Sequence, residues 1–464
     1  MRKLRVLFIL AALAVMMLPC ALMPVLPSTI GAENRLPAEW PSLFREGRLN
    51  LSFPTQYESW LQDHISHRSI CISLFSRMMQ AIGTSSEPQV LLGQDGWLYF
   101  RETLNDYTCE APLSDDGIAR LALLLETADD GLRRSGSSLI LAIAPNKASI
   151  YPQFMNPAYP RGEISSGNAD RLRRTVHVPW VPLFTLLSER SDEGVYFRKD
   201  THWNGLGARI AANAILKEIQ SQTGVDLSLP DTHADYLVRT DWPADLARML
   251  NPYSSAVEPQ QYYADSGAFT YQGRFRSAED LTIRTAGGAA DLKLLVLRDS
   301  FSNQLITDIS SAVREVTYLR AMPLPLNESE GFDAVLLEMA ERRLPELLEA
   351  PPVMYAPKAM TPQGLDAARS VEIHLQSEQT GSGLRIYGSL SQPPCKVEEL
   401  SVGLVTDHGE TWYRAFPVSG LPDDGNGGFS VLLDTVPDCD RILVYMRGES
   451  ESVKAEASFS NPKG

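Results

Sequence analysis

The sequence is poor in cysteine and in positive charge, and each shortage excludes a class of protein. Five cysteines occur in 464 residues, and none forms a Cys-x-x-Cys pair, which excludes a zinc ribbon. Acidic residues outnumber basic ones by 57 to 42. A nucleic-acid partner, which needs a basic surface, is therefore not expected. Repeats and long low-complexity tracts are also absent, and the length predicts two or three folded units.

The N-terminus carries a long apolar run. Residues 1–5 are basic, and residues 6–26 are apolar, broken only by Pro19, Cys20 and Pro24. This pattern is typical of a secretory signal or of a single membrane anchor. Small residues suited to cleavage are scarce near its end, so we expect an uncleaved anchor within residues 1–30. The positive-inside rule then predicts a single-pass cell-membrane protein with an extracytoplasmic domain, and cleavage would instead give a secreted protein.

An α/β domain is predicted over residues 31–360. Continuous apolar runs, typical of strands buried on both faces, lie at residues 138–145, 292–297, 316–319 and 334–337. Helical patterns separate them at residues 206–219, 303–313 and 341–348. This alternation predicts a parallel sheet with flanking helices on both faces. A further amphipathic helix is expected over residues 56–82.

The pattern changes after Pro351 and Pro352. Short alternating strands follow, separated by turn-rich segments, and they predict an antiparallel β-sandwich accessory domain over residues 365–464. Two cysteines of this part, Cys395 and Cys439, fit a disulfide in an oxidising compartment and fit free buried thiols equally well.

A first chemical motif is the pair Asp200 and His202. In an extended backbone, residues two apart point to the same side. A carboxylate placed in this way accepts a hydrogen bond from one imidazole nitrogen and leaves the other free as a base. Asn204 is a good N-cap, so we expect the pair in a loop at the entrance of a helix.

A second motif centres on Ser300. This serine lies between the strand that ends at Leu297 and the helix expected from Asn303, at the carboxyl end of a parallel strand, where open α/β sheets bind ligands. Backbone N–H groups at that helix start could stabilise an oxyanion. Each motif alone is weak, because Asp-x-His is common and a serine before a helix is usually just a cap. Their shared position at strand-to-helix transitions of one sheet favours a catalytic site.

These motifs resemble those of a known family. The segment Asp200-Thr201-His202-Trp203, with residues 205–208 and 297–302, looks like the SGNH-hydrolase-like proteins of the alginate O-acetylation type (AlgX/AlgJ-like) and their DHHW relatives. Further similar segments lie at residues 33–35, 63–68, 93–99, 144–147, 332–338 and 341–344, so the resemblance covers roughly residues 33–350. The chain has Asp-Thr-His-Trp where the DHHW relatives have Asp-His-His-Trp. Asp-Thr-His-Trp matches the alginate branch of the family.

The resemblance implies a serine O-acetyltransferase with an SGNH-type triad. Ser300 would be the nucleophile, His202 the general base and Asp200 the residue that orients His202. An acetyl group would pass onto Ser300 and then onto a hydroxyl of an exported or cell-surface polysaccharide. A membrane-bound O-acyltransferase is the implied partner that supplies the acetyl group, and no cofactor is implied. A carbohydrate-binding role for the predicted sandwich is suggested only by its C-terminal position and its fold class, because no residue motif supports it.

Lys147, Arg298 and Trp203 are candidate substrate-binding residues. The two cations suit an anionic or hydroxyl-rich substrate, and the indole could stack on a sugar ring. The alternatives to substrate binding are structural: Lys147 could be solvated, Arg298 could pair with a carboxylate, and Trp203 could lie in the core. No metal is expected, because zinc needs convergent ligands and nothing in the sequence brings His64 or His67 to the Asp200 loop.

Two other functions fit the same residues. A carbohydrate acetylesterase would use the same triad with water as the acceptor. A non-catalytic, glycan-binding scaffold would keep the fold while Ser300 and His202 diverge. The distances between these side chains separate the scaffold from the two enzymes.

Overall fold

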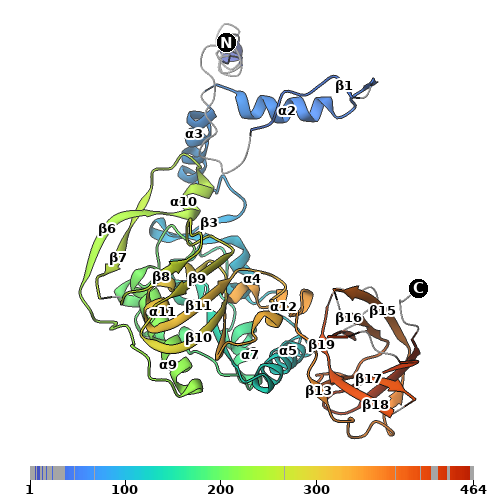
Figure 1. Ribbon diagram of the computed structural model, residues 1–464. Helices are drawn as coiled ribbons and strands as arrows, with labels where there is room; N and C mark the ends of the chain where they lie inside the picture. The colour runs from blue at the N-terminus through green and yellow to red at the C-terminus, as the bar shows by residue number, and fades with distance from the viewer. Residues whose placement is uncertain are drawn as a thin grey trace.

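The protein consists of an α/β body, a C-terminal β-sandwich and an N-terminal helical arm (Figure 1). The computed structural model describes residues 37–45, 47–66, 68–265, 267–381, 383–407, 409–419, 427–435 and 439–459, with scattered positions before residue 37. The predicted anchor within residues 1–30 lies almost entirely outside the described residues. Among the residues that are described, no helix has the length and apolar character needed to cross a bilayer.

A six-stranded sheet forms the centre of the α/β body, in the order β5-β12-β10-β11-β9-β8. Its strands are β5 (Ser138–Ala144), β12 (Ala334–Ala340), β10 (Ala290–Leu297), β11 (Val313–Leu319), β9 (Thr282–Ala286) and β8 (Thr270–Gln272). The first four run parallel, as the sequence predicts; Leu294 of β10, for example, pairs with Ala334 on one side and Val316 on the other. Their carboxyl ends therefore share one edge of the sheet.

The expectation of a wholly parallel sheet was wrong at one side, where β9 and β8 add in antiparallel fashion. The buried residues of β9 alternate with exposed ones, Ile283 and Thr285 inward and Thr282 and Arg284 outward. Strands of this kind keep one face in solvent, as antiparallel strands commonly do. Because β8 and β9 contain no continuous apolar run, the sequence pattern did not predict them.

Helices cover both faces of the sheet. Alternate strand residues point to opposite faces, so Ile140 and Ala142 of β5 join one core while Leu139 and Leu141 join the other. The first core includes residues of α8 (Leu183–Glu189), α9 (Gly205–Thr223) and α11 (Ile306–Ala312); the second includes α5 (Asp115–Arg134), α7 (Asn168–Thr175) and α12 (Glu346–Glu349). The predicted arrangement of flanking helices is present.

Several helix boundaries differ from expectation. The helix expected over residues 206–219 is α9, but residues 303–313 divide into the 3₁₀ turn η6 (Phe301–Gln304) and α11, and residues 341–348 into η8 (Glu341–Arg343) and α12. The helix expected over residues 56–82 is two helices, α2 (Phe53–His64) and α3 (Arg68–Ala81), because Ile65 is extended and ends α2. Helix α5, capped by Ser114, was not predicted.

The C-terminal part is a sandwich of two sheets around one apolar core. One sheet contains β13 (Lys358–Ala359), β18 (Gly409–Arg414), β17 (Glu399–Thr406), β21 (Arg441–Arg447), β22 (Ser452–Ser458) and β14 (Arg369–Ser370). The other contains β15 (Ile373–Thr380), β16 (Gly383–Leu390), β20 (Gly428–Leu433) and β19 (Phe416–Pro417). Cys439 is buried and Cys395 is exposed, and they are not joined as a disulfide.

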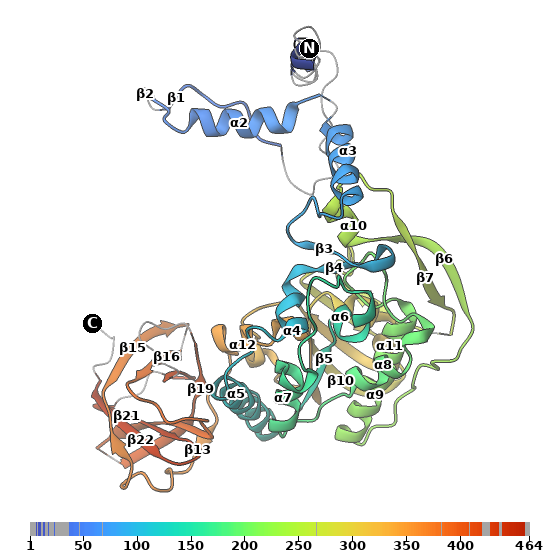
Figure 2. The same cartoon turned by 180° about the vertical axis from the view of Figure 1, so that it is seen from behind.

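Helix α5 attaches the sandwich to the α/β body, as both views show (Figures 1 and 2). The guanidinium of Arg120, itself 1% exposed, donates hydrogen bonds to the backbone oxygens of Val418 and Gly428 and to the hydroxyl of Ser419. A buried cation satisfied by backbone carbonyls of the other unit fixes the position of the sandwich against the helix.

Smaller elements surround the carboxyl edge of the sheet. They are the hairpin β3 (Val90–Leu92) and β4 (Leu98–Phe100), the long hairpin β6 (Tyr236–Pro243) and β7 (Val257–Tyr263), and the helices α4 (Leu104–Thr108), α6 (Lys147–Ile150) and α10 (Asp245–Leu250). The arm adds β1 (Phe44–Arg45) and β2 (Arg48–Leu49). The hairpin β6–β7 packs against α9, and α10 packs against β3 and β4.

The start of α9 also lies close to the loop that precedes it. A Cβ atom at Gly207 would lie 2.2 Å from the backbone oxygen of Val195, so Gly207→Ala should lower the free energy of unfolding by about 1–3 kcal/mol, the usual cost of overpacking. Urea unfolding of the purified protein measures this. Gly267→Ala is the control, because its nearest neighbour is 3.4 Å away. Equal stability of the two variants would contradict the close approach.

Candidate active site

Ser300, His202 and Asp200 form a continuous series of hydrogen bonds. The Nε2 atom of His202 lies 2.8 Å from Ser300 Oγ, and its Nδ1 atom lies 2.7 Å from Asp200 Oδ1. Ser300 follows β10 and precedes η6, while the Asp200–His202 pair precedes α9. The structure thus brings together two loops 98 residues apart in sequence, at the carboxyl edge of the sheet.

The carboxylate of Asp200 is held rigidly. It is 2% exposed, and its Oδ1 also accepts the backbone N–H of His202 at 3.0 Å. Its Oδ2 accepts the N–H of Asp245 at 2.9 Å and the indole N–H of Trp242 at 3.2 Å. Because both oxygens accept N–H groups, the Nδ1 of His202 acts as the donor to Asp200, which leaves Nε2 as the acceptor that faces Ser300.

This environment shifts the pKa values of Asp200 and His202 in opposite directions. Burial alone would raise the pKa of Asp200, but the hydrogen bond and the charge of His202, with the N–H of Asp245, hold that pKa below its ordinary value. Burial alone would lower the pKa of His202; the hydrogen bond and the negative charge of Asp200, with Asp245 and Asp299 nearby, raise it instead. His202 is therefore a stronger base than an exposed histidine.

Asp200, His202 and Asp245 could also be considered as metal ligands, since their ligand atoms lie within 4.8 Å of one another. The oxygens of Asp200 are already used by N–H donors, and Oδ1 of Asp245 accepts the N–H groups of Thr201 and Leu246. A cation would have to displace these donors. The donor set therefore fits a hydrogen-bonded triad better than a metal centre.

The histidines of the arm belong elsewhere. His64 stacks on Trp60 within α2, and its Nδ1 lies 2.8 Å from the Trp60 backbone oxygen. His67 lies outside the described residues.

Trp203 connects the two loops of the site. Its indole N–H donates to the backbone oxygen of Phe301 at 3.1 Å, and its own backbone oxygen accepts the side-chain amide of Gln304 at 2.6 Å. The side chain is fully buried. The prediction that Trp203 stacks on a substrate ring is therefore corrected: it joins the histidine loop to the serine loop from inside the protein.

Lys147 is likewise not available to a substrate. It is 3% exposed, and its ammonium donates to the backbone oxygens of Phe197, Arg198 and Asp200. Burial lowers its pKa to about 8, against the opposing charges of Asp245, Asp200 and Glu258. Its role is to shape the loop that carries Asp200, so the predicted substrate contact is corrected.

Arg298 has a similar supporting role. It is 4% exposed and donates to Asn303 Oδ1 and to the backbone oxygens of Ala278 and Asp280. These bonds fix the turn that carries Ser300 against the segment preceding β9. The predicted substrate-binding role is corrected here too, since the guanidinium is enclosed by protein acceptors.

The turn around Ser300 leaves two N–H groups available. The N–H of Phe301 is bonded to Asp299 Oδ1 at 2.9 Å, and Asp299 Oδ2 accepts the N–H of Ala340 at 2.8 Å. Those of Ser300 and Ser302 have no hydrogen-bond acceptor among the described residues. They are the candidate donors to an oxyanion formed beside Ser300 Oγ.

Sequence reasoning missed the residues that support the triad from the long hairpin. Trp242 lies near the end of β6 and Asp245 begins α10, and both donate to Asp200. Glu258 of β7 accepts the N–H groups of Arg198 and Lys199 at 2.9 and 2.7 Å. The only sequence signal was an acidic residue at a helix start, Asp245, and nothing in that pattern pointed to Asp200.

Fold and site together define an α/β protein with a serine–histidine–aspartate constellation at the carboxyl edge of its sheet. Residues 90–281 match the family described as SGNH hydrolase-like domain, acetyltransferase AlgX. The predicted resemblance to AlgX/AlgJ-like proteins is confirmed by this match and by a curated relative, probable alginate O-acetylase AlgJ of Pseudomonas putida, 26% identical over 201 residues. That alignment covers 42% of this chain and 49% of the relative.

Solved structures similar to part of this chain include the O-acetyltransferase domain of P. putida AlgJ, with 20% identity, a TM-score of 0.37 and coverage of 56% of this chain and 92% of that one. A DHHW family protein from Eubacterium siraeum has 14% identity, a TM-score of 0.39 and coverage of 55% and 95%. The chain spans about half the length of the curated relatives it matches. The matched family region contains Asp200 and His202 and ends before Ser300.

The electrostatics of the pair can be tested without any substrate. In a ¹H–¹⁵N NMR titration of the imidazole, His202 should titrate above the ordinary histidine pKa, because Asp200 stabilises the imidazolium. Asp200→Asn should lower that pKa, whereas Ser300→Ala, which removes no charge, should leave it above the ordinary value. A His202 pKa that Asp200→Asn does not change would contradict the geometry.

Proposed function

We propose that this protein is an extracytoplasmic O-acetyltransferase that moves an acetyl group through Ser300, His202 and Asp200 onto a polysaccharide. The observation that carries the proposal is the hydrogen-bonded series from Ser300 Oγ through both nitrogens of His202 to Asp200. A nucleophile, its base and the group that orients the base are the parts that acyl transfer requires. The names of the curated relatives, alginate O-acetylases, support this reaction and this class of substrate.

The first half-reaction forms an acetyl-enzyme. Ser300 Oγ attacks the carbonyl carbon of an acetyl ester or thioester donor while His202 Nε2 takes the hydroxyl proton. The negative oxygen of the tetrahedral intermediate faces the free N–H groups of Ser300 and Ser302. When the intermediate collapses, the bond to the leaving group breaks, and the protonated His202 returns the proton to that group. Asp200 stabilises the imidazolium while it carries the proton.

The second half-reaction transfers the acetyl group. A glycan hydroxyl attacks the acetyl carbonyl on Ser300, and His202 Nε2 takes its proton. Collapse breaks the bond to Ser300 Oγ, which regains the proton from His202, and the glycan leaves as an acetyl ester. Water in place of the glycan hydroxyl would make the same site an acetylesterase. The Asp200–His202 pair can take the proton from a glycan hydroxyl or from water.

Location and partner belong to the same proposal. The basic start and the apolar run of residues 6–26 support attachment to the cell membrane with the α/β body outside. A membrane-bound O-acyltransferase is proposed as the partner that supplies the acetyl group, because acetyl thioesters are made inside the cell and the acceptor lies outside.

The decisive variant is Ser300→Ala. With p-nitrophenyl acetate as donor and a polysaccharide as acceptor, it should lose at least about a thousandfold in rate. Mass spectrometry of the unmodified enzyme should place one acetyl group on the peptide that contains Ser300. Ser311→Ala, on α11 and bonded only to backbone oxygens, is the matched control. Equal rates for Ser300→Ala and the control would remove Ser300 from the mechanism, and free acetate as sole product would identify an esterase.

The pH profile should follow the charge of His202. The imidazole must be neutral to accept the proton, and its pKa is raised by Asp200. The rate should therefore fall as pH decreases, with a midpoint above the ordinary histidine pKa. In Asp200→Asn that midpoint should move to lower pH and the rate should drop by a factor of about 10⁴. A pH-independent rate in the range where His202 titrates would contradict its role as the base.

A further inference from the structure

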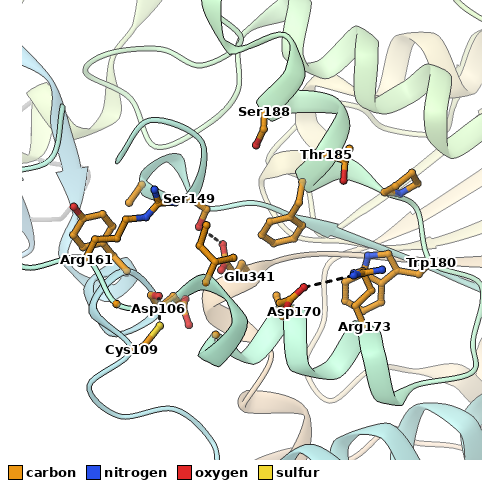
Figure 3. A pocket seen from close by; sticks show the side chains of 18 residues that line it. Asp106, Cys109, Ser149, Arg161, Asp170, Arg173, Trp180, Thr185, Ser188 and Glu341 are labelled. Atoms are coloured by element: carbon orange, nitrogen blue, oxygen red, sulfur yellow. Dashed lines mark hydrogen bonds and ion pairs between the residues drawn. The ribbon is translucent and has the colours of Figure 1, made fainter. Parts of the chain in front are cut away.

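A cavity of about 440 Å³ lies near the same edge of the sheet as the triad, and none of the triad residues lines it. Its walls include residues of α4, α6, α7 and α8. Glu341, the first residue after β12, and Ser149 of α6 lie side by side within it (Figure 3). A cavity of this size that gathers polar groups from several elements has the character of a small-molecule site.

Two carboxyl groups of the cavity lining are hydrogen-bonded to the same residue, Asn146. Oε2 of Glu341 accepts the Asn146 backbone N–H at 2.9 Å and the Ser149 hydroxyl at 2.6 Å. The side-chain amide of Asn146 donates to Asp106 Oδ2 at 2.8 Å. The hydrogen bonds of Glu341 with the described residues use Oε2 only, and Oε1 is not among the fully buried atoms that lack a partner, so it is open to the cavity. An unsatisfied oxygen of this kind is a site for a ligand hydroxyl.

The pair offers both a donor and an acceptor at neutral pH. Burial, reinforced by the charge of Asp106, raises the pKa of Glu341 to about 8. Burial also raises the pKa of Asp106, to about 6, against the hydrogen bond from Asn146. Glu341 is then mostly protonated and Asp106 mostly ionised. A protonated carboxyl donates to a hydroxyl oxygen and a carboxylate accepts from a hydroxyl, so the two suit a ligand that carries hydroxyl groups.

The other side of the cavity is aromatic. Trp180 and Phe184 contribute apolar surface, and Thr185 and Ser188 of α8 add hydroxyls (Figure 3). The indole N–H of Trp180 is buried and has no partner among the described residues. Sugar rings present apolar faces and a hydroxylated edge, and an aromatic surface opposite polar groups matches both.

The cavity is held open by a close backbone contact. Gly162 packs so tightly on α4 that a Cβ atom there would lie 2.3 Å from the backbone oxygen of Thr108. Its N–H donates to the backbone oxygen of Tyr107 at 2.9 Å. The wall formed by residues 161–164 is therefore fixed before any ligand binds.

The residue after Glu341 contacts the serine turn of the triad. Arg342, which follows Glu341, lies over the ring of Phe301, with 5.9 Å from the guanidinium carbon to the ring centroid. Phe301 follows Ser300, and its ring packs on His202 at 4.8 Å. Arg342 and Phe301 thus connect the residue that follows Glu341 with the residue that follows Ser300.

We propose that this cavity binds one uncharged pyranose ring and serves as a glycan subsite beside the triad. Two carboxyl groups disfavour an acidic sugar, because its carboxylate would be buried near the charge of Asp106. Arg161 and Arg173 also line the cavity, but both are exposed and Arg173 is paired with Asp170. An ion pair at an exposed position compensates little of that cost. Assigning the ring to the acetyl acceptor rests on the function proposed above, whereas binding itself needs no residue of the triad.

Saturation-transfer NMR on the purified full-length protein tests the subsite. The probes are the methyl pyranosides of glucose, mannose and galactose, together with their uronate counterparts. At least one neutral glycoside should receive saturation at millimolar concentration, and more strongly than its uronate. Thr185→Trp should abolish the signal, because Thr185 lines the cavity from an exposed position of α8. Glu189→Trp, exposed on the same helix and outside the lining, should keep it.

The outcomes distinguish the subsite from the enzyme. Ser300→Ala should still bind the glycoside after losing acetyl transfer; if the unmodified protein binds but transfers no acetyl group, only the proposed function is lost. The subsite is refuted if no neutral glycoside binds, if the uronate binds better, or if Thr185→Trp binds unchanged. Circular dichroism and thermal unfolding check that Thr185→Trp folds, and Ser188→Trp replaces it if it does not.

Discussion

The site depends on the pair of hydrogen bonds that Trp203 makes with the turn after Ser300. Its indole donates to Phe301 and its backbone oxygen accepts from Gln304, so the histidine loop and the serine turn are joined in both directions. Gln260 extends the link, since its amide donates to Gln304 and its oxygen accepts the N–H of Gly205. The 2.8 Å separation between His202 Nε2 and Ser300 Oγ is a consequence of this buried connection. A single hydrogen bond between the two side chains would not hold two mobile loops together, whereas the bonds of Trp203 and Gln260 fix both loops.

Electrostatic balance explains why a buried cation lies under the acidic loop. Asp200, Asp245 and Glu258 place three carboxyl groups close together; Asp200 and Glu258 are buried, and Asp245 is partly exposed. Lys147 binds three backbone oxygens of that loop and is attracted by all three carboxyl groups. A lysine in this position fixes the backbone and offsets part of the negative charge, without contacting the imidazole or a substrate.

The sequence was informative where one residue type implies one environment. Four apolar runs predicted the four parallel strands, and the position of Ser300 after a strand and before a helix predicted its place at the carboxyl edge. The Asp200–His202 pair was also expected after a strand of the sheet, and this was wrong: the element before it is a 3₁₀ turn at Ser191–Glu193. The sequence was uninformative where the partner is distant: Trp242, Asp245 and Glu258 reach the site from a hairpin whose polar alternation is typical of any exposed strand. Lys147, Arg298 and Trp203 were taken for surface contacts because their burial depends on backbone oxygens supplied by other loops, which no local pattern records.

The protonation state of Glu338 affects the charge behind the nucleophile, Ser300. It is fully buried on β12, accepts the Ser302 hydroxyl at 2.6 Å, and its pKa is raised well above the ordinary value by burial and by the charge of Asp299. A neutral Glu338 adds no negative charge beside the place where an oxyanion would form, whereas an ionised one would oppose it in a low-dielectric interior. Asp200, surrounded by N–H donors, stays ionised. Carboxyl groups near one edge of the sheet therefore take different charge states because their hydrogen-bond donors differ: Asp200 keeps its negative charge behind His202, whereas a neutral Glu338 adds none to the charge of Asp299 beside Ser300.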